Sequence, residues 1–195
     1  MLIDWKDVES DIKASDLSTL LAACDFLTAS GLLIDSIQSP SIWMTASCDA
    51  GIRNHLAQSS SELGGLLLGE LYELPYRTRH GYTHITKITH SIPSSDYKSS
   101  PVSLRMQTEI WSKARESIDN GLRVIGWYHS HPNLGAFFSG TDRATQAAFF
   151  NMPYSVGIVI DTIRNERRCF FGPHSIEAEL KPGSHTISTE VRREK

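Results

Sequence analysis

The sequence predicts an α/β fold, with one domain over residues 41–180. Two kinds of segment alternate along the chain. Short runs that are apolar, or that alternate apolar and polar residues, are typical of strands, and the segments between them have helical periodicity. The 195 residues are 40% hydrophobic and 21% charged, which is a globular composition with the length that one ordinary domain needs. These two observations place the core of the protein after residue 40.

The first 40 residues predict a helical extension of that domain. Apolar residues repeat at helical spacing from Leu17 to Leu27, and Gly31 is expected at the C′ position that ends the helix. Pro40 then closes the segment. The extension is expected to pack on the main domain, and a separate element that binds a partner protein is the alternative.

Strand and helix patterns follow in order within the domain. Its first half predicts a strand at 42–46, a helix at Cys48–Gln58, and strands at Leu66–Tyr72 and Thr83–Ile92. Next come a helix from Pro101 to Asn120-Gly121 with Met106, Ile110, Ala114 and Ile118 on one face, a strand at Leu122–His131, and a helix at Thr141–Phe150. The last elements are strands at Val156–Ile160 and Arg167–Phe171 in a hairpin around Arg164-Asn165, and a polar, frayed tail at 181–195.

Composition excludes several classes of protein. A net charge of −3 argues against a strongly basic nucleic-acid binder, and no apolar run is long enough to span a bilayer. Acidic residues stand near the N-terminus where a secretory signal needs basic ones, and three cysteines are too few for a disulfide framework. We therefore expect a soluble, cytoplasmic protein without nucleic-acid or membrane partners.

The segment from His129 to Asp142 predicts a metal site. On a strand, side chains at i and i+2 share a face, so His129 and His131 are expected to point the same way. Asp142 becomes available as a third ligand after the chain turns back at residues 132–135. Two histidines and one carboxylate leave a fourth position open, which is the layout of a catalytic zinc site, although the ligand types do not exclude other divalent metals.

A simpler interpretation covers part of the same segment. Ser139 followed by Asp142 three residues later has the signature of a capping box at a helix start. The two histidines could be polar residues at a strand edge. The capping box explains Ser139 and Asp142 but leaves the histidine pair unexplained.

A zinc hydrolase also needs a base, and Glu62 is the candidate. It stands at the head of an apolar, glycine-rich strand, Gly64–Gly69, where a carboxylate can face a cleft. Taken alone, a glutamate at a strand start is usually a solvated side chain. Trp127 and Tyr128 are expected to pack around the histidine strand and shape the site.

Three segments together resemble the JAMM metalloprotease domain, also called MPN+ or JAB, over about residues 41–172. They are Glu62-x-x-Gly65-Leu66-x-x-Gly69, Gly126-Trp-Tyr-His-Ser-His-Pro132 and Ser139-x-x-Asp142. The resemblance implies a mixed, curved sheet flanked by helices, similar to cytidine deaminases. Matched to the family pattern, His129, His131 and Asp142 are zinc ligands, Glu62 is the general acid/base and Ser139 stabilises the oxyanion.

The second and third segments look especially like those of the proteasomal and signalosome deubiquitinases and deneddylases. This implies a zinc isopeptidase that removes ubiquitin or a ubiquitin-like protein from its targets. A stand-alone domain also resembles the prokaryotic members, some of which belong to antiviral conjugation systems. The alternatives are processing of a ubiquitin-like or sulfur-carrier precursor, a small-peptide amidase, and a non-catalytic MPN scaffold.

Two segments depart from the family pattern or extend it. Close relatives carry Gly-Cys-Trp-Leu where this chain has Gly135-Ala-Phe-Phe138, which predicts a different pocket wall. In the family, a segment between the glutamate strand and the histidine strand holds the substrate's extended tail. Ser94–Ser100 occupies that interval here and is expected to be a substrate clamp or a plain connector.

Overall fold

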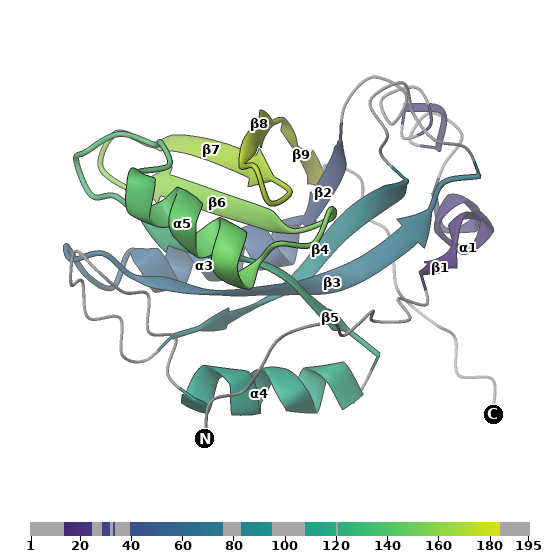
Figure 1. Cartoon of the computed structure of the whole chain (residues 1–195), viewed down its shortest axis with the longest axis horizontal. Coiled ribbons are helices and arrows are strands. Elements are labelled where there is room, and N and C mark those ends of the chain that lie inside the picture. Colours follow the sequence, from purple (N-terminus) through teal and green to yellow (C-terminus); the bar gives the residue numbers. More distant parts are fainter. Residues whose placement is uncertain are drawn as a thin grey trace.

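The computed structural model describes residues 14–24, 29–31, 33, 40–75, 83–94, 108–119 and 121–183. Its strands form one nine-stranded sheet in the order β8-β7-β6-β5-β3-β4-β2-β9, with β1 paired to β3 (Figure 1). The strands are β1 Ser15–Asp16, β2 Ser41–Thr45, β3 Gly64–Glu73, β4 His84–Pro93, β5 Arg123–Ser130, β6 Val156–Asp161, β7 Glu166–Phe171, β8 Ile176–Ala178 and β9 Leu180–Gly183. The helices whose bounds lie within the described residues are α1 Leu17–Ala22, α3 Ala46–Leu56, α4 Thr108–Asp119 and α5 Gly140–Phe149.

The sheet is mixed and curved, which confirms the predicted fold class. Its centre, β3, is antiparallel to β4 and β5, whereas β5 runs parallel to β6 and β2 runs parallel to β4. The pairing of β3 shifts register between Leu67 and Leu68 on the β5 side and between Leu68 and Gly69 on the β4 side. Such bulges increase the local twist of a strand, and Figure 1 shows β3 curving through the middle of the molecule.

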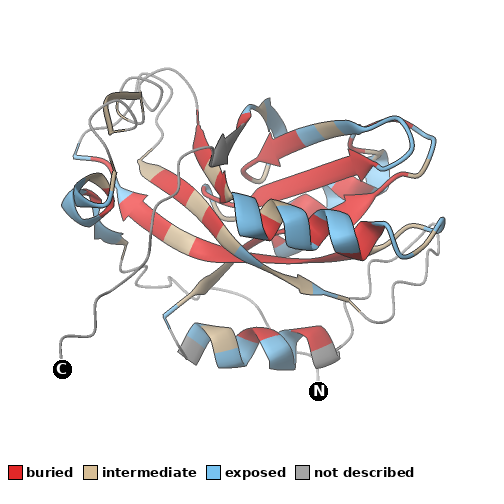
Figure 2. Ribbon diagram, turned by 180° about the vertical axis from the view of Figure 1, so that it is seen from behind, coloured by how far each residue is buried: buried red, intermediate tan, exposed pale blue. Residues whose placement is uncertain are grey.

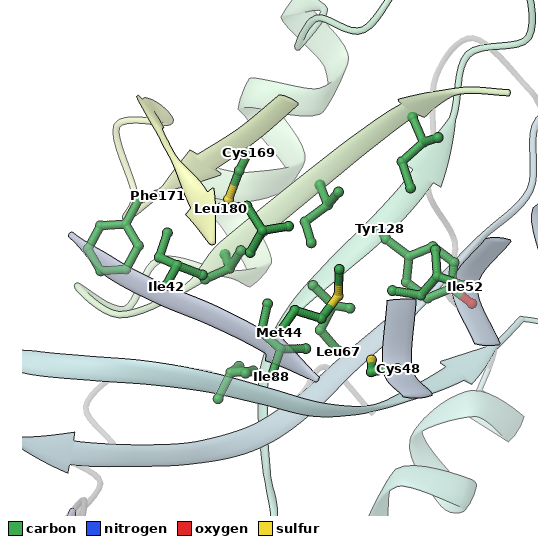
Figure 3. Packing of buried hydrophobic residues seen from close by; sticks show 14 of the residues in the cluster. Ile42, Met44, Cys48, Ile52, Leu67, Ile88, Tyr128, Cys169, Phe171 and Leu180 are labelled. Atoms are coloured by element: carbon green, nitrogen blue, oxygen red, sulfur yellow. The ribbon is translucent and has the colours of Figure 1, made fainter. Parts of the chain in front are cut away.

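Both faces of the central strands are buried, which explains why the Leu66–Leu68 run is apolar without a break. Leu67 belongs to a cluster that includes Ile52 of α3, part of which Figure 3 shows. Leu66 and Leu68 belong to a second cluster that includes Ile110 of α4. Figure 2 shows the resulting band of buried residues along the middle of the sheet. No described helix is long and apolar enough to cross a membrane.

Helix α3 begins and ends two residues earlier than the sequence predicts. Thr45 is its N-cap, and the Thr45 hydroxyl accepts a hydrogen bond from the Cys48 nitrogen at 3.3 Å. The helix therefore begins at Ala46, since a threonine in this position satisfies a free N–H group of the first turn. Cys48 is buried against the sheet, and burial raises the pKa of its thiol to about 12.

The apolar face of α4 is narrower than predicted. Ile110 and Ala114 are buried, whereas Ile118, predicted on the same helical face, is 45% exposed. Eight residues along a helix of 3.6 residues per turn place Ile118 roughly 80° around from Ile110. Gly121 has a φ of 90°, as expected of the glycine that ends a helix. Residues 101–107, including Met106, lie outside the described residues, as do residues 95–100 of the expected clamp.

The N-terminal helix is shorter than predicted. Asp16 caps α1, which ends at Ala22, and Gly31 is itself helical rather than the residue that ends the helix. Leu17 and Leu20 are buried against the sheet in a cluster with Tyr72, Leu74 and Ile85. The described part of the extension thus packs on the domain, while residues 1–13 and 25–28 lie outside the described residues.

The chain continues in the sheet beyond residue 180, where a polar tail was expected. β9 pairs in parallel with β2, with Leu180 opposite Ile42. The sequence of residues 181–183 does not have the pattern of a strand. Pro182 has no N–H to donate, and this is tolerated because β9 is an edge strand of the described sheet. Residues 184–195 lie outside the described residues.

Candidate metal centre

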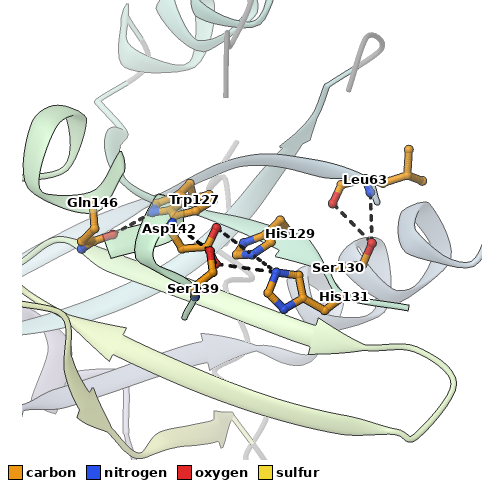
Figure 4. A network of polar contacts seen from close by, with 8 residues as sticks. All are labelled: Leu63, Trp127, His129, Ser130, His131, Ser139, Asp142 and Gln146. Carbon is orange, nitrogen blue, oxygen red and sulfur yellow. Dashed lines mark hydrogen bonds and ion pairs between the residues drawn. The ribbon is translucent and has the colours of Figure 1, made fainter. Parts of the chain in front are cut away.

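The end of β5 positions the two histidines. His129 is fully buried and His131 is 5% exposed, and their Nε2 atoms lie 3.0 Å apart (Figure 4). The alternation of side chains along a strand explains why they meet while Ser130 between them faces away. The structure thus confirms the prediction that the His129 and His131 side chains lie on the same face of the strand.

A buried carboxylate, Asp161 at the end of β6, shapes the turn after His131. Its Oδ atoms accept hydrogen bonds from the nitrogens of Asn133 at 3.0 Å and Gly135 at 2.7 Å. They also accept from the nitrogens of Ile163 and Arg164, at 2.9 and 3.0 Å. Burial raises the pKa of Asp161, but these backbone donors outweigh it and hold the pKa well below its usual range. Asp161 thereby fixes the loop that returns the chain from His131 toward Asp142.

Asp142 stands in the first turn of α5, inside a complete capping box. The Ser139 hydroxyl accepts from the Asp142 nitrogen at 3.2 Å, and the Ser139 nitrogen donates to Asp142 Oδ2 at 2.7 Å. The Ser139 hydroxyl also donates to Asp142 Oδ2 at 2.6 Å. The capping-box interpretation is thus correct, and it holds together with the metal-site interpretation because the box aims the carboxylate at the histidines.

The three candidate ligands converge on one point. Asp142 Oδ1 lies 3.4 Å from His129 Nε2, and Asp142 Oδ2 lies 3.6 Å from His131 Nε2. Burial raises the pKa of Asp142, but contacts with His129 and Ser139 lower it to about 2, so it is ionised. Burial and the neighbouring His129 lower the pKa of His131, against the charges of Asp142 and Glu62, which favours a neutral imidazole.

This donor set fits a divalent metal ion. Two donors about 2.1 Å from one tetrahedral ion lie roughly 3.4 Å apart, close to the distances among these three side chains. At 3.0 Å, one Nε2 atom can donate its proton to the other, so a single proton serves both nitrogens. Within the described residues, neither His129 Nδ1 nor His131 Nδ1 has a hydrogen-bond partner. A cation between the Nε2 atoms would compensate both lone pairs and the charge of Asp142.

Glu62 lies in the short segment before β3, and it is half-buried. Its charge is one of those that raise the pKa of His131. The next residue, Leu63, is tied to β5: its nitrogen donates to Ser130 Oγ at 3.0 Å, and its carbonyl accepts from the Ser130 nitrogen at 2.8 Å. The structure thus brings Glu62, Ser139 and the three candidate ligands to one region.

The sequence did not single out Ser130, Gln146 and Asp161, which support this region. Trp127, in contrast, was expected to shape the site, and its ring stacks on the His129 ring at 4.6 Å and 8°. The same expectation is wrong for Tyr128, because alternation turns it to the opposite face. There its hydroxyl lies 2.9 Å from His55 Nδ1. The spacing of Gln146, one helical turn after Asp142, was the signal that could have identified it.

The fold and the cluster together are those of a JAB-type domain with a donor set that could hold a metal ion. The chain belongs to the family described as prokaryotic homologs of the JAB domain, which matches residues 45–171, more than half of the chain.

Two relatives and one solved structure show the extent of the likeness. The NAD(+) hydrolase TcpA of Theionarchaea archaeon (strain DG-70-1) is 33% identical over 101 residues, covering 51% of this chain and 27% of that protein. The COP9 signalosome complex subunit 5 of Eremothecium gossypii is 42% identical over 52 residues, covering 26% of this chain and 12% of that protein. The chain therefore spans about a quarter or less of the length of these relatives. The solution structure of protein DSY2949 from Desulfitobacterium hafniense shares the fold with a TM-score of 0.54 at 20% identity, over 74% of this chain and 94% of that one.

Proposed function

We propose that this protein is a zinc-dependent isopeptidase that hydrolyses the bond between the C-terminus of ubiquitin or a ubiquitin-like protein and its target. The convergence of His129, His131 and Asp142 within 4.8 Å of one another, in buried surroundings, carries this proposal. Membership of the JAB family supports the reaction class, and the signalosome relative supports a ubiquitin-like substrate.

The same three side chains would hold the ion, through the two Nε2 atoms and the Asp142 carboxylate. A zinc ion held there supplies Lewis-acid chemistry, which polarises the scissile carbonyl group and makes water more acidic. Three protein ligands leave a coordination position for the reaction, which a closed structural zinc site does not. The neutral state favoured for His131 and the ionised state of Asp142 are the forms that bind metal.

Glu62 is the proposed acid/base. Its carboxylate accepts a proton from the attacking water and returns it to the leaving amine, so the amide and water become a carboxylic acid and a free amine. When that amine is a lysine ε-amine, the reaction releases the ubiquitin-like protein from its target. The position of Glu62 near His131 supports this role.

Ser139 is the proposed oxyanion donor, and the structure adds a condition to that role. Its hydroxyl is bound to Asp142 Oδ2 at 2.6 Å, so it must turn away before it can donate to the substrate. Asp142 Oδ2 would retain the Ser139 backbone nitrogen at 2.7 Å. The Ser139 hydroxyl can therefore turn to the substrate while Asp142 Oδ2 still accepts a hydrogen bond from the Ser139 nitrogen.

Processing of a ubiquitin-like precursor would use the same residues, and the substrate distinguishes the two reactions. A non-catalytic scaffold would not require the buried ligand cluster. The relative named as an NAD(+) hydrolase matches over 27% of its length, and no described residue of this chain favours transfer of that activity.

The test is hydrolysis of a panel of ubiquitin-like proteins, each joined to lysine or as a linear fusion. The zinc-loaded protein should cleave at least one lysine-linked conjugate, and a chelator should abolish cleavage. Cleavage of linear fusions alone would favour precursor processing. A zinc-loaded, folded protein that cleaves none of them would contradict the proposed function.

A further inference from the structure

Gln146 is a fully buried amide on the inner face of α5, one helical turn after Asp142 (Figure 4). Its Oε1 accepts a hydrogen bond from Trp127 Nε1 at 2.7 Å. Its Nε2 donates to the carbonyl of Gly172 at 3.2 Å and, more weakly, to that of Ser155 at 3.5 Å. An amide in a dry interior is costly unless both of its ends are bonded, and here both are.

Trp127 links this amide to the metal centre. The indole is fully buried, and its face stacks on the ring of His129 with centroids 4.6 Å apart and planes within 8°. The indole edge carries the N–H that bonds Gln146. The Trp127 side chain therefore contacts the candidate ligand His129 with the face of its indole ring, and it contacts Gln146 of α5 with the edge of that ring.

Strand β6 makes room for this arrangement. A Cβ atom at Gly157 would lie 2.9 Å from Gln146 Oε1 and 2.4 Å from Phe138 Cζ. Any larger residue at Gly157 would displace both side chains. The pocket that holds the amide is thus formed by β5, β6 and α5 together.

We propose that Gln146 is a positioning residue for the metal centre. Together with Trp127 it sets the distance between the Asp142 carboxylate on α5 and the histidines on β5, and so it sets the affinity for the metal. Partners that orient ligands in this indirect way typically change metal affinity by about 10- to 100-fold when they are removed. The inference rests on the metal centre of the proposed function, but it does not depend on the substrate or on turnover.

The variants are Gln146→Leu, Trp127→Phe and the double variant, with the zinc dissociation constant measured by competition with a chromophoric chelator. Each single variant should bind zinc about tenfold more weakly or worse. The double variant should lose less than the product of the two single losses, because both changes break one hydrogen bond. Trp127→Phe keeps an aromatic ring against His129, so it tests the hydrogen bond even where Gln146→Leu fails to fold.

Ile52→Ala is the matched control, since Ile52 is fully buried in α3 and belongs to the other core cluster. It should lower the melting temperature and leave the zinc dissociation constant within about twofold of wild type. With Co²⁺ in place of zinc, the visible absorption spectrum should change in the Gln146 and Trp127 variants and not in the control.

Wild-type zinc affinity in folded Trp127→Phe and Gln146→Leu, or an equal loss in Ile52→Ala, would overturn the inference alone. A wild-type protein that binds no zinc would overturn the proposed function together with it.

Discussion

The hydroxyl of Ser130 accepts a hydrogen bond from the backbone nitrogen of Leu63 at 3.0 Å. Ser130 is 1% exposed and lies between the two histidines, on the opposite side of the strand. Its own nitrogen donates to the Leu63 carbonyl at 2.8 Å. The two bonds fasten the segment that carries Glu62 to the strand that carries two of the candidate ligands.

Ser130→Ala should lower kcat for a ubiquitin-like conjugate by about 10- to 100-fold while zinc stays bound. The substitution leaves the Leu63 N–H without its side-chain acceptor, so the segment that carries Glu62 is held to β5 there only by the backbone bond of Ser130 and is looser. Steady-state kinetics and metal analysis of the same sample measure the two effects. Ser130→Thr keeps a hydroxyl and should restore most of the rate; an alanine variant with wild-type kcat would contradict this role.

Glu62→Gln should keep the metal and the fold while turnover is lost. The amide has nearly the shape of the carboxylate but does not accept the proton of the attacking water. Glu62→Asp should fail nearly as badly, because the shorter side chain misplaces the base. Rate measurements on zinc-loaded samples of equal concentration decide the matter, and retained hydrolysis in Glu62→Gln would reject Glu62 as the acid/base.

Ser139→Ala should combine two losses, since Ser139 is both the proposed oxyanion donor and the N-cap of α5. The rate should fall by about 10²–10³, and loss of the cap should cost about 1 kcal/mol of stability. Ser139→Gly separates the two, because glycine retains most of the cap's stability. Equal rate losses in both variants, with a higher melting temperature for glycine, are expected. A glycine variant with near wild-type turnover would show that the hydroxyl only caps the helix.

Asp161→Asn should destabilise the protein in a pH-dependent way. The folded pKa of Asp161 is lowered by its backbone donors, so its stabilising effect is complete above the unfolded pKa of about 3.9 and is lost as the pH falls below that value. Melting temperatures of wild type and variant should therefore differ at neutral pH and converge on acidification below about pH 4. A difference that stays constant or widens at low pH would contradict this assignment.

Local patterns of the sequence were sufficient to predict that His129, His131 and Asp142 lie together. The histidine pair depends on strand alternation and the carboxylate on helix capping, and both are set by residues within a few positions of one another. The same alternation places Leu67 in one core cluster and Leu66 and Leu68 in the other. These features were predictable because each is fixed locally.

The remaining features depend on contacts between distant segments. β9 exists because its backbone pairs with β2, and nothing in the composition of 181–183 indicates a strand. The bonds of Asp161 to Gly135 and of Gln146 to Trp127 join residues 26 and 19 positions apart. Ser130 was overlooked because its partner is a backbone nitrogen 67 positions away. A single sequence does not reveal such pairs without the register of the sheet.

The zinc content of purified wild type and His131→Ala tests the central claim most directly. His131 supplies one of three converging donor atoms, and its loss leaves two, which are insufficient for a stable site. Elemental analysis should find close to one zinc per chain in the wild type and little in the variant, with both folded. Full zinc occupancy in His131→Ala, or a folded wild type that takes up no zinc, would contradict the account.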